Sequence, residues 1–418
     1  MKARYQYRFY PTDQQQRSLA QLFGCCRVVW NDALALCKQA EKLPGFNKLS
    51  AFLTQTKKTL ERSWLADVSA VPLQQSLRNL DAAYRNFFNS RNGKRKGGKM
   101  GIPKFKKRTN KQSAEFTKAA FSIDRKSVYL AKIGDLQPIW SRDLPSNPSS
   151  VTVIKDCANR YFLSFVVEIE PVVTDAQNQS IGVDLGIRTF AVMSDNSKAF
   201  SPEYSKPNRK IRRLQKKLAR QQKAESLRTG SPLGGGPVQQ TMQKTQADSK
   251  RRNITRIRIA KLHNQIADTR KDFLHKLSTK LVSENQTIVL EDLNVAGMVK
   301  NRKLSRAISQ QGWGEFRTFC EAKCEKFGRT FTVINRWIPT SQVCSSCGFR
   351  WGKIGLSVRS VVCLSCHTEH DRDENASKNI EMVGTGNWHD LKWAGSDSKT
   401  TSVASCDEPP RITVASAR

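Results

Sequence analysis

Four cysteines near the end of the chain have the spacing of a structural zinc site. Two Cys-x₂-Cys pairs are separated by fifteen residues, and the ligands would be Cys344, Cys347, Cys363 and Cys366. Four thiolates at this spacing bind Zn²⁺ tetrahedrally in zinc ribbons. A reactive dithiol pair is the alternative, but no thioredoxin-like pattern surrounds these residues. Because four thiolates complete the coordination sphere, His367 and His370 are expected to lie outside the ligand set.

Three acidic residues indicate a second site of a different kind. Asp184 and Glu291 each end a short apolar run typical of a buried strand, and Asp373 opens a helical pattern. Carboxylates suit Mg²⁺ or Mn²⁺, and two such ions about 4 Å apart can activate water and stabilise the leaving oxygen of a phosphodiester. Taken singly, an Asp after a strand is more often a turn or cap residue. The prediction of hydrolytic strand cleavage therefore depends on the three acids converging.

The third acid could be either of two aspartates. Asp371 and Asp373 both stand near the start of the pattern "DENASKNI". We favour Asp373 because Asn375 and Asn379 follow it on the same face of the expected helix. The zinc site just before this helix would anchor the segment and fix the approach of Asp373 to the other acids.

The N-terminal part of the chain is predicted to begin with a strand and a helical region. Residues 5–9 alternate in polarity, and Thr12 with Gln15 makes a capping box for a helical pattern that runs to about residue 40. A break at Gly24 predicts two helices within that pattern. A helix-turn-helix DNA reader is one interpretation of the pair, but ordinary packing of two helices in a domain is favoured.

Another amphipathic helix and then further strands are predicted downstream. The helix covers about residues 72–88, and the Gly-rich, strongly basic segment 89–112 follows it. Ile102 and Phe105 in that segment favour a docked loop over a solvated tether. Period-two patterns then predict strands and a hairpin that turns at Asn159. The first half of the chain is thus expected to be a β-rich body interrupted by helices.

A second domain is predicted to begin after a polar linker near residue 175. Two long helical segments in it, 208–223 and 250–282, each carry an apolar stripe and a dense Arg/Lys face. Because the charge on that face is nearly all of one sign, a nucleic-acid backbone fits it better than solvent alone. The segment between the two helices, 224–250, has the composition of a disordered loop.

The net charge of the chain also points to nucleic acid as the partner. The formal net charge is +35, far more than solubility requires. A membrane surface is the competing anion, but no spanning segment and no signal-peptide core is evident, so a cytoplasmic, nucleoid-associated prokaryotic protein is expected. The nucleic-acid contacts are expected from Lys94, Arg95, Lys96, Lys104, Lys106, Lys107, Arg209, Arg212, Arg213, Lys216, Arg251, Arg252 and Arg256.

The motifs resemble, in order and spacing, those of one known family. "GVDLGIRTFAV", "VLEDLNV", "CSSCG" with "CLSC", and "HDRDENASKNI" are similar to motifs of the OrfB/TnpB family of insertion-sequence proteins, relatives of type V CRISPR effectors. The upstream pieces "RVVWNDAL" and "GIPKFKKR" agree, so the resemblance covers about residues 1–385. One departure is His367, which stands where glycine is frequent in the family and would alter the zinc knuckle turn without removing a ligand.

This resemblance implies a mixed α/β, multidomain fold. An RNase H-like RuvC nuclease domain would carry a zinc-ribbon insertion and follow a β-barrel wedge domain that bears a helical recognition insertion. The implied boundaries are 1–14 and 96–174 for the wedge domain, 15–95 for the recognition insertion, 175–341 and 368–390 for the nuclease domain, 342–367 for the zinc ribbon, and 391–418 for a disordered tail.

The resemblance also implies an activity. In that family a guide RNA from the transposon end pairs with one strand of double-stranded target DNA, while the protein reads a short flanking motif. Asp184, Glu291 and Asp373 fall on the family's catalytic acids, and the four cysteines fall on its zinc site. The implied cofactors are Mg²⁺ (or Mn²⁺) and Zn²⁺, and a monomer is expected.

Two other functions compete with RNA-guided cleavage. One is a DNA- or RNA-binding regulator of transposition or transcription that never cuts, which the three intact acids disfavour. The other is a transposase that joins single strands with paired histidines and a tyrosine nucleophile. None of the five histidines forms the required pair, because the spacing of His367 and His370 is wrong.

Overall fold

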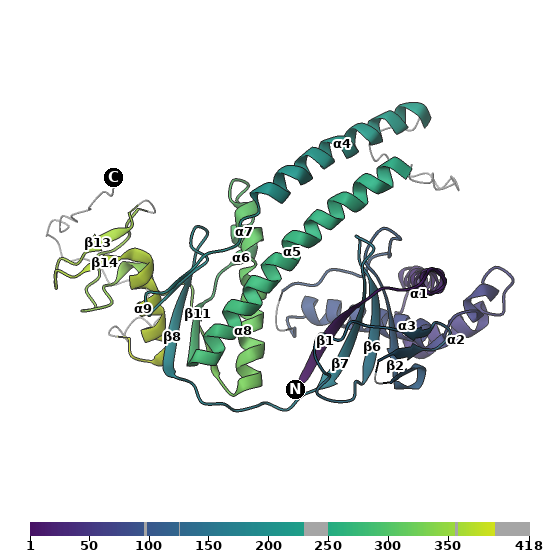
Figure 1. Cartoon of the computed structure of the whole chain (residues 1–418), viewed down its shortest axis with the longest axis horizontal. Coiled ribbons are helices and arrows are strands. Elements are labelled where there is room, and N and C mark those ends of the chain that lie inside the picture. The colour runs from purple at the N-terminus through teal and green to yellow at the C-terminus, as the bar shows by residue number, and fades with distance from the viewer. Residues whose placement is uncertain (96–97, 125, 230–249, 356–357, 389–418) are drawn as a thin grey trace. The chain divides into compact units, whose positions relative to one another are not determined.

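The computed structural model describes residues 1–95, 98–124, 126–229, 250–355 and 358–388 (Figure 1). The chain forms two compact units, each assembled from two stretches of sequence. One unit comprises Met1–Ile169 with Arg213–Lys261, and the other comprises Glu170–Arg212 with Leu262–Arg418. No helix in the described ranges is long and apolar enough to cross a membrane.

Two segments predicted from sequence to be disordered lie wholly or mostly outside the described residues. The predicted tail at 391–418 and most of the predicted loop at 224–250 lie outside the described residues. Helix α4 (Ser205–Thr229) extends into the start of that loop, and helix α5 (Lys250–Glu284) begins at its end.

An antiparallel sheet with the strand order β1-β7-β6-β2 forms the body of the first unit. Its strands are β1 (Lys2–Phe9), β2 (Gln112–Thr117), β6 (Ser150–Lys155) and β7 (Tyr161–Glu168). The predicted hairpin is confirmed, because β6 and β7 pair up to Lys155 and Tyr161, and Asn159 turns the chain with φ 63°. A smaller antiparallel sheet contains β3 (Phe121–Ile123), β4 (Val128–Leu130) and β5 (Gly134–Leu136).

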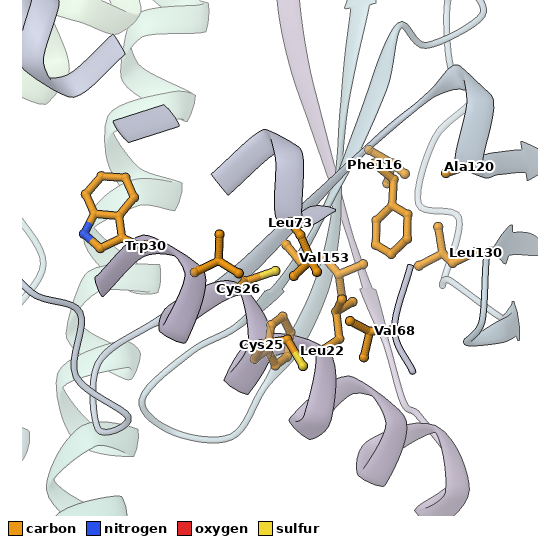
Figure 2. Packing of buried hydrophobic residues seen from close by; sticks show 14 of the residues in the cluster. Leu22, Cys25, Cys26, Trp30, Val68, Leu73, Phe116, Ala120, Leu130 and Val153 are labelled. Atoms are coloured by element: carbon orange, nitrogen blue, oxygen red, sulfur yellow. The ribbon is translucent and has the colours of Figure 1, made fainter. Parts of the chain in front are cut away.

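Helices pack beside these strands in one hydrophobic core. They are α1 (Asp13–Gln39), α2 (Phe46–Thr56) and α3 (Ala70–Arg91), with short 3₁₀ turns η1 (Ser63–Ala66) and η2 (Lys118–Ala120). The predicted capping box of Thr12 and Gln15 is present at the start of α1. Side chains of α1, such as Leu22 and Cys26, lie beside Leu73 of α3 and Val153 of β6 (Figure 2).

The predicted break at Gly24 is wrong. Helix α1 runs without interruption through this residue, and both of its halves bury side chains in the same core. A glycine inside a helix costs only about 1 kcal/mol relative to alanine. Burial of the apolar face on either side of Gly24 exceeds that cost, so tertiary packing overrides the local preference.

A mixed sheet with the order β10-β9-β8-β11-β12 forms the centre of the second unit. Its strands are β8 (Asn178–Leu185), β9 (Ala191–Met193), β10 (Lys198–Ala199), β11 (Asn285–Glu291) and β12 (Thr330–Ile334). Strands β8, β11 and β12 are parallel, whereas β9 and β10 run antiparallel to their neighbours. The parallel strands are apolar on both faces, as strands covered by helices on both sides must be.

Helices cover both faces of this sheet. Ile288 and Leu290 of β11 pack with helix α5 and with α8 (Trp313–Phe327), whereas Val289 packs with Ile380 of α9 (Arg372–Thr385) on the opposite face. The remaining elements are α6 (Val295–Met298), α7 (Ser305–Gln311), the 3₁₀ turn η3 (Thr340–Gln342), and the two short strands β13 (Ser360–Val362) and β14 (Glu369–Asp371).

Two glycines allow α9 to lie directly against the sheet. A Cβ atom at Gly182 of β8 would collide with the carbonyl oxygen of Ser377 and lie 2.5 Å from the amide nitrogen of Glu381. A Cβ atom at Gly384 of α9 would collide with the side chain of Val289. Any larger residue at these positions would push the helix away from the strands that end at the candidate site.

Candidate active site

The structure brings the three predicted acids to one edge of the sheet in the second unit. Strands β8 and β11 are parallel neighbours in which Val183 pairs with Leu290, so Asp184 and Glu291 follow at the next positions. Asp373 lies in the first turn of α9, which packs against both strands. Carboxyl ends of adjacent parallel strands are where α/β sheets gather ligands.

The charges of Asp373 and Glu291 act on the Asp184 carboxyl group. Burial, followed by the negative charges of Asp373 and Glu291, raises the pKa of Asp184 to about 7. Burial also raises the pKa of Glu291, helped by the adjacent charge of Asp292. Like charges held together in a partly desolvated place retain protons, and a bound cation removes that penalty. The donor set and its electrostatics therefore fit a hard divalent cation.

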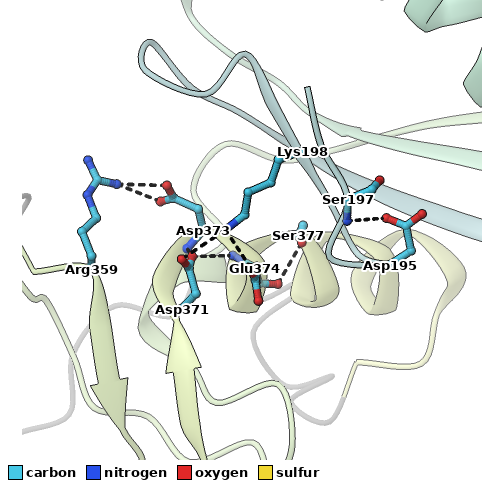
Figure 3. Close-up of polar contacts among 8 residues, drawn as sticks. All are labelled: Asp195, Ser197, Lys198, Arg359, Asp371, Asp373, Glu374 and Ser377. Atoms are coloured by element: carbon cyan, nitrogen blue, oxygen red, sulfur yellow. Dashed lines mark hydrogen bonds and ion pairs between the residues drawn. The ribbon is translucent and has the colours of Figure 1, made fainter. Parts of the chain in front are cut away.

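The two candidate aspartates on α9 have different partners. The Asp371 carboxylate caps the helix, accepting hydrogen bonds from the amides of Asp373 (2.9 Å) and Glu374 (3.2 Å). The Asp373 carboxylate instead accepts two bonds from Arg359, at 3.0 and 3.1 Å (Figure 3). Of the two aspartates, Asp373 is the one whose charge is among the causes that raise the pKa of Asp184.

Lys198 of the edge strand β10 forms ion pairs with residues at the start of α9. The Lys198 ammonium lies 2.8 Å from a carboxylate oxygen of Glu374 and 3.5 Å from one of Asp371 (Figure 3). The hydrogen bond to Glu374 is the main cause that raises the pKa of Lys198. This cation offsets part of the negative charge around the site and links β10 to the helix that carries Asp373.

The predicted zinc ligands also come together. The four Sγ atoms of the predicted set lie within 4.8 Å of one another, the one such close group of His, Cys, Asp or Glu ligand atoms found among the described residues. Cys344 Sγ is 3.7 Å from Cys366 Sγ, and Cys347 Sγ is 3.6 Å from Cys363 Sγ. Zn–S bonds of about 2.3 Å in a tetrahedron place sulfur atoms about 3.8 Å apart, so the spacing suits Zn²⁺.

The two turns that present these thiols have matching geometry. The amide of Gly348 donates to the Cys344 carbonyl at 3.0 Å, and the amide of His367 donates to the Cys363 carbonyl at 2.9 Å. Gly348 has φ 78° and His367 has φ 57°. The second turn therefore uses the left-handed conformation that glycine adopts without cost, and the histidine accepts the strain.

His370 supports the thiol cluster from outside it. Its Nε2 atom lies 3.1 Å from Cys344 Sγ, and the residue is buried against the ring of Trp351. Burial lowers the pKa of His370, which favours the neutral imidazole. A neutral ring at this distance can donate a hydrogen bond to a thiolate without entering the ligand set.

Two asparagines of α9 bind the backbone that leads into the zinc cluster. The Asn379 amide donates to the carbonyls of Thr340 and Val343, both at 2.7 Å. The Asn375 side chain donates through Nδ2 to the Val343 carbonyl at 2.8 Å, and its Oδ1 accepts from the backbone N–H of Ser345 at 2.8 Å. Both asparagines are buried, so the helix that carries Asp373 is also the anchor of the zinc ribbon.

The predicted nucleic-acid contacts are mostly surface residues. Those exposed are Lys94, Lys104, Lys106, Lys107, Arg209, Arg212, Arg213, Lys216 and Arg251, whereas Arg95, Arg252 and Arg256 are partly covered. Lys96 lies outside the described residues. Surface exposure is compatible with a role in binding, which stays a prediction for each of these residues.

The basic segment before β2 is docked on α1, as Ile102 and Phe105 suggested. Asn31 holds the backbone of Lys106 by two hydrogen bonds, of 2.8 and 3.1 Å, and the Trp30 indole donates to the carbonyl of Lys104 at 3.1 Å. The Lys106 ammonium lies 3.9 Å from the centroid of the Trp30 ring. Desolvation there lowers the pKa of Lys106. This lysine therefore contributes to docking of the loop as well as to its charge.

Several residues that shape the site were not singled out from sequence. They are Gly182, Lys198, Arg359 and Gly384, each of which acts across elements far apart in the chain. The pattern around each of them looked like an ordinary strand, turn or helix end. A glycine within the apolar run of β8 was the one available signal, because glycine weakens a strand unless another backbone approaches closely.

Comparison with known proteins identifies the family. The model of the OrfB family of IS605 elements, described as "Probable transposase", matches residues 164–231 and 238–302. A Streptomyces pristinaespiralis protein named "Putative RNA-guided DNA endonuclease" is 38% identical over 393 residues, covering 92% of this chain and 90% of that protein. The chain belongs to the OrfB/TnpB family. The resemblance read from the motifs is thereby confirmed.

A second relative and a domain model agree with the assignment of this OrfB/TnpB chain. An Escherichia coli protein named "Putative RNA-guided DNA endonuclease InsQ" is 29% identical over 91% of this chain and 92% of its own length. A Cas12f1-like TNB domain model matches residues 313–380, which contain the thiol cluster. A Cas12f1–sgRNA–target DNA complex has a TM-score of 0.43 and 14% identity, covering 88% of this chain and 82% of that one.

One family description differs from the local structure. A helix-turn-helix model of the same OrfB family matches residues 1–42. In this chain that stretch forms the strand β1 and the single helix α1. The structure thus supports packing rather than a helix-turn-helix reader within residues 1–42.

Proposed function

We propose that this OrfB/TnpB chain is a transposon-associated, RNA-guided DNA endonuclease that cuts target DNA by metal-dependent phosphodiester hydrolysis. The observation that carries the proposal is the placement of Asp184 and Glu291 at the carboxyl ends of β8 and β11, with Asp373 in the first turn of α9. Burial, followed by the charges of Asp373 and Glu291, raises the pKa of Asp184 to about 7. The relatives named as RNA-guided DNA endonucleases supply the substrate class.

Asp184, Glu291 and Asp373 would hold divalent cations in this mechanism. Bound Mg²⁺ or Mn²⁺ would activate a water nucleophile and stabilise charge on the leaving oxygen. Asp184 must lose its proton to become a ligand. Asp373 must exchange Arg359 for the metal, so this arginine competes with the cation for the same carboxylate. Lys198 keeps α9 in place through Glu374 while this exchange occurs.

The thiol cluster would have a structural role. Cys344, Cys347, Cys363 and Cys366 would hold Zn²⁺, which closes the ribbon whose Arg359 contacts Asp373. Burial raises the pKa of the Cys344 thiol to about 12, a penalty that a bound cation removes by favouring the thiolate.

The proposed division of the chain follows the resemblance described above. The nuclease domain, of RNase H-like RuvC type, is assigned to 175–341 and 368–390, with the ribbon at 342–367. The wedge domain is assigned to 1–14 and 96–174, and the recognition insertion to 15–95. The basic side chains named above are assigned to contacts with guide RNA and with double-stranded DNA, and the protein is proposed to act as a monomer.

The experiment begins with the RNA that copurifies with the protein. Sequencing should give a discrete species from the end of the element, and a plasmid that contains the matching target should be cut in Mg²⁺. Asp184→Ala should abolish cutting, whereas Asp195→Asn should not, because Asp195 is an exposed turn residue of the same unit. Equal cutting by Asp184→Ala and the unsubstituted protein would refute the proposed site.

A further inference from the structure

A tryptophan beside the candidate site is almost entirely exposed. The Trp337 side chain is 78% accessible, the most exposed tryptophan among the described residues. Large aromatic side chains usually bury most of their surface, so exposure of this extent is an informative departure. Its neighbour Ile338 packs with Val289 and Ile380, so the hydrophobic core does not need the indole to anchor this segment.

Trp337 lies in the turn that follows the end of β12. Glu291 pairs with Ile334 in the parallel ladder of β11 and β12, and Trp337 follows three residues after Ile334. The Asn335 side chain accepts the Trp337 amide at 3.1 Å, and the Asn335 carbonyl accepts the Ile338 amide at 3.1 Å. The indole therefore projects from a hydrogen-bonded turn at the edge of the sheet where β11 ends.

Two arginines lie beside this turn. Arg317 and Arg336 both pair with the Asp292 carboxylate, at 2.8 and 3.4 Å. These two guanidinium groups and their shared carboxylate together carry one positive charge. The Arg336 guanidinium carbon also lies 6.0 Å from the centroid of the Trp337 ring. An exposed aromatic ring beside positive charge is the arrangement by which proteins bind single-stranded nucleic acid.

We propose that Trp337 is a stacking platform for an unpaired base of the DNA strand delivered to Glu291, with Arg317 and Arg336 attracting its backbone. This inference rests on the proposed function and adds a residue that positions the strand to be cut. A duplex keeps its bases stacked on one another, so a base can lie on the indole only where the strand has been separated.

The test measures binding of short oligonucleotides to the full-length, zinc-loaded protein in buffer without Mg²⁺. The probes are a short oligodeoxythymidylate carrying 2-aminopurine, whose fluorescence falls on stacking, and an abasic oligomer with the same phosphates. The measurements are made at moderate salt, which weakens contacts to the phosphates. Stacking is worth about 1–3 kcal/mol per base, so Trp337→Leu should weaken binding of the thymidylate about 5- to 150-fold.

Three comparisons make the result specific. Trp337→Phe keeps an aromatic face and should retain most of the affinity, and the abasic oligomer should not respond to Trp337→Leu. Phe200→Leu is the matched control, because Phe200 is 65% exposed and follows β10, the edge strand opposite β12. Melting temperature and zinc content should match those of the unsubstituted protein in every variant.

The proposal is overturned if Trp337→Leu binds the thymidylate normally, or if the abasic oligomer loses as much affinity as the thymidylate. A loss confined to oligouridylate would assign the indole to RNA and also overturn it. The two proposals fail separately. Target cleavage by the unsubstituted protein with unchanged binding by Trp337→Leu would remove only the stacking platform, whereas absence of cleavage with intact stacking would remove only the endonuclease.

Discussion

Replacement of Asp184 by asparagine should change stability in a pH-dependent way. The folded protein holds the Asp184 proton up to a pKa of about 7, whereas the unfolded chain releases it near the ordinary value of 3.8. The folded state therefore binds more protons between these values, and its stability falls as the pH rises through that window. Above pH 7 the loss is complete. Asparagine resembles the protonated acid and does not undergo this loss.

The size of the expected stability change follows from the part of this pH range in which melts can be measured. Between about pH 5.5 and about pH 7 the unsubstituted protein loses about 1.4 kcal/mol per pH unit, or about 2 kcal/mol. The Asp184 residue keeps some contact with solvent, so this figure is an upper bound. For a unit of this size 2 kcal/mol corresponds to about 4–8 °C in Tm.

Thermal melts in buffer without added Mg²⁺, with the zinc retained, provide the assay. The Tm of Asp184→Asn minus that of the unsubstituted protein should grow by several degrees from pH 5.5 to pH 8. Asp195→Asn serves as control, because it makes the same chemical change at an exposed turn. A Tm difference for Asp184→Asn that does not depend on pH would refute the reasoning. Added Mg²⁺ at pH 8 should stabilise the unsubstituted protein and not this variant.

Three further substitutions test the packing around the site. Gly182→Ala should lower Tm by several degrees, because its Cβ would collide with Ser377, and melts check this directly. Asn379→Ala should destabilise the second unit by about 1–3 kcal/mol in denaturant titrations, because the Thr340 carbonyl loses its donor and the Val343 carbonyl keeps only the one from Asn375. His367→Gly should relieve the left-handed turn and stabilise the ribbon by about 1 kcal/mol, measured as slower zinc release to a chelator.

The sequence predicted the placement of the candidate site where the signal was local. The apolar runs before Asp184 and Glu291 predicted two strands, and parallel neighbours that end in acids place those acids at one end of a sheet. The spacing of the two Cys-x₂-Cys pairs predicted the thiol cluster. The capping box at Thr12 and the hairpin at Asn159 were likewise predicted from local pattern.

What the sequence could not predict depends on contacts between distant segments. Arg359 meets Asp373 only because the ribbon folds back beside α9, and Lys198 reaches Glu374 across the sheet edge. The break expected at Gly24 failed for a similar reason, because a local preference of about 1 kcal/mol is smaller than the burial gained by a continuous helix. No local pattern contains these tertiary contributions.

The rotation of helix α9 about its axis sets the direction of side chains that act on two different parts of the structure. Asp373 acts on Asp184 through its charge, while Asn375 and Asn379 bind the backbone that enters the ribbon. Each residue of an α-helix turns the next by about 100°. One amino acid inserted between Asp373 and Asn375 would rotate Asp373 about the helix axis relative to the two asparagines. The ribbon would stay bound to α9, but the Asp373 carboxylate would point away from the other acids. Related chains should therefore carry no insertion or deletion in this stretch, even where many substitutions are tolerated.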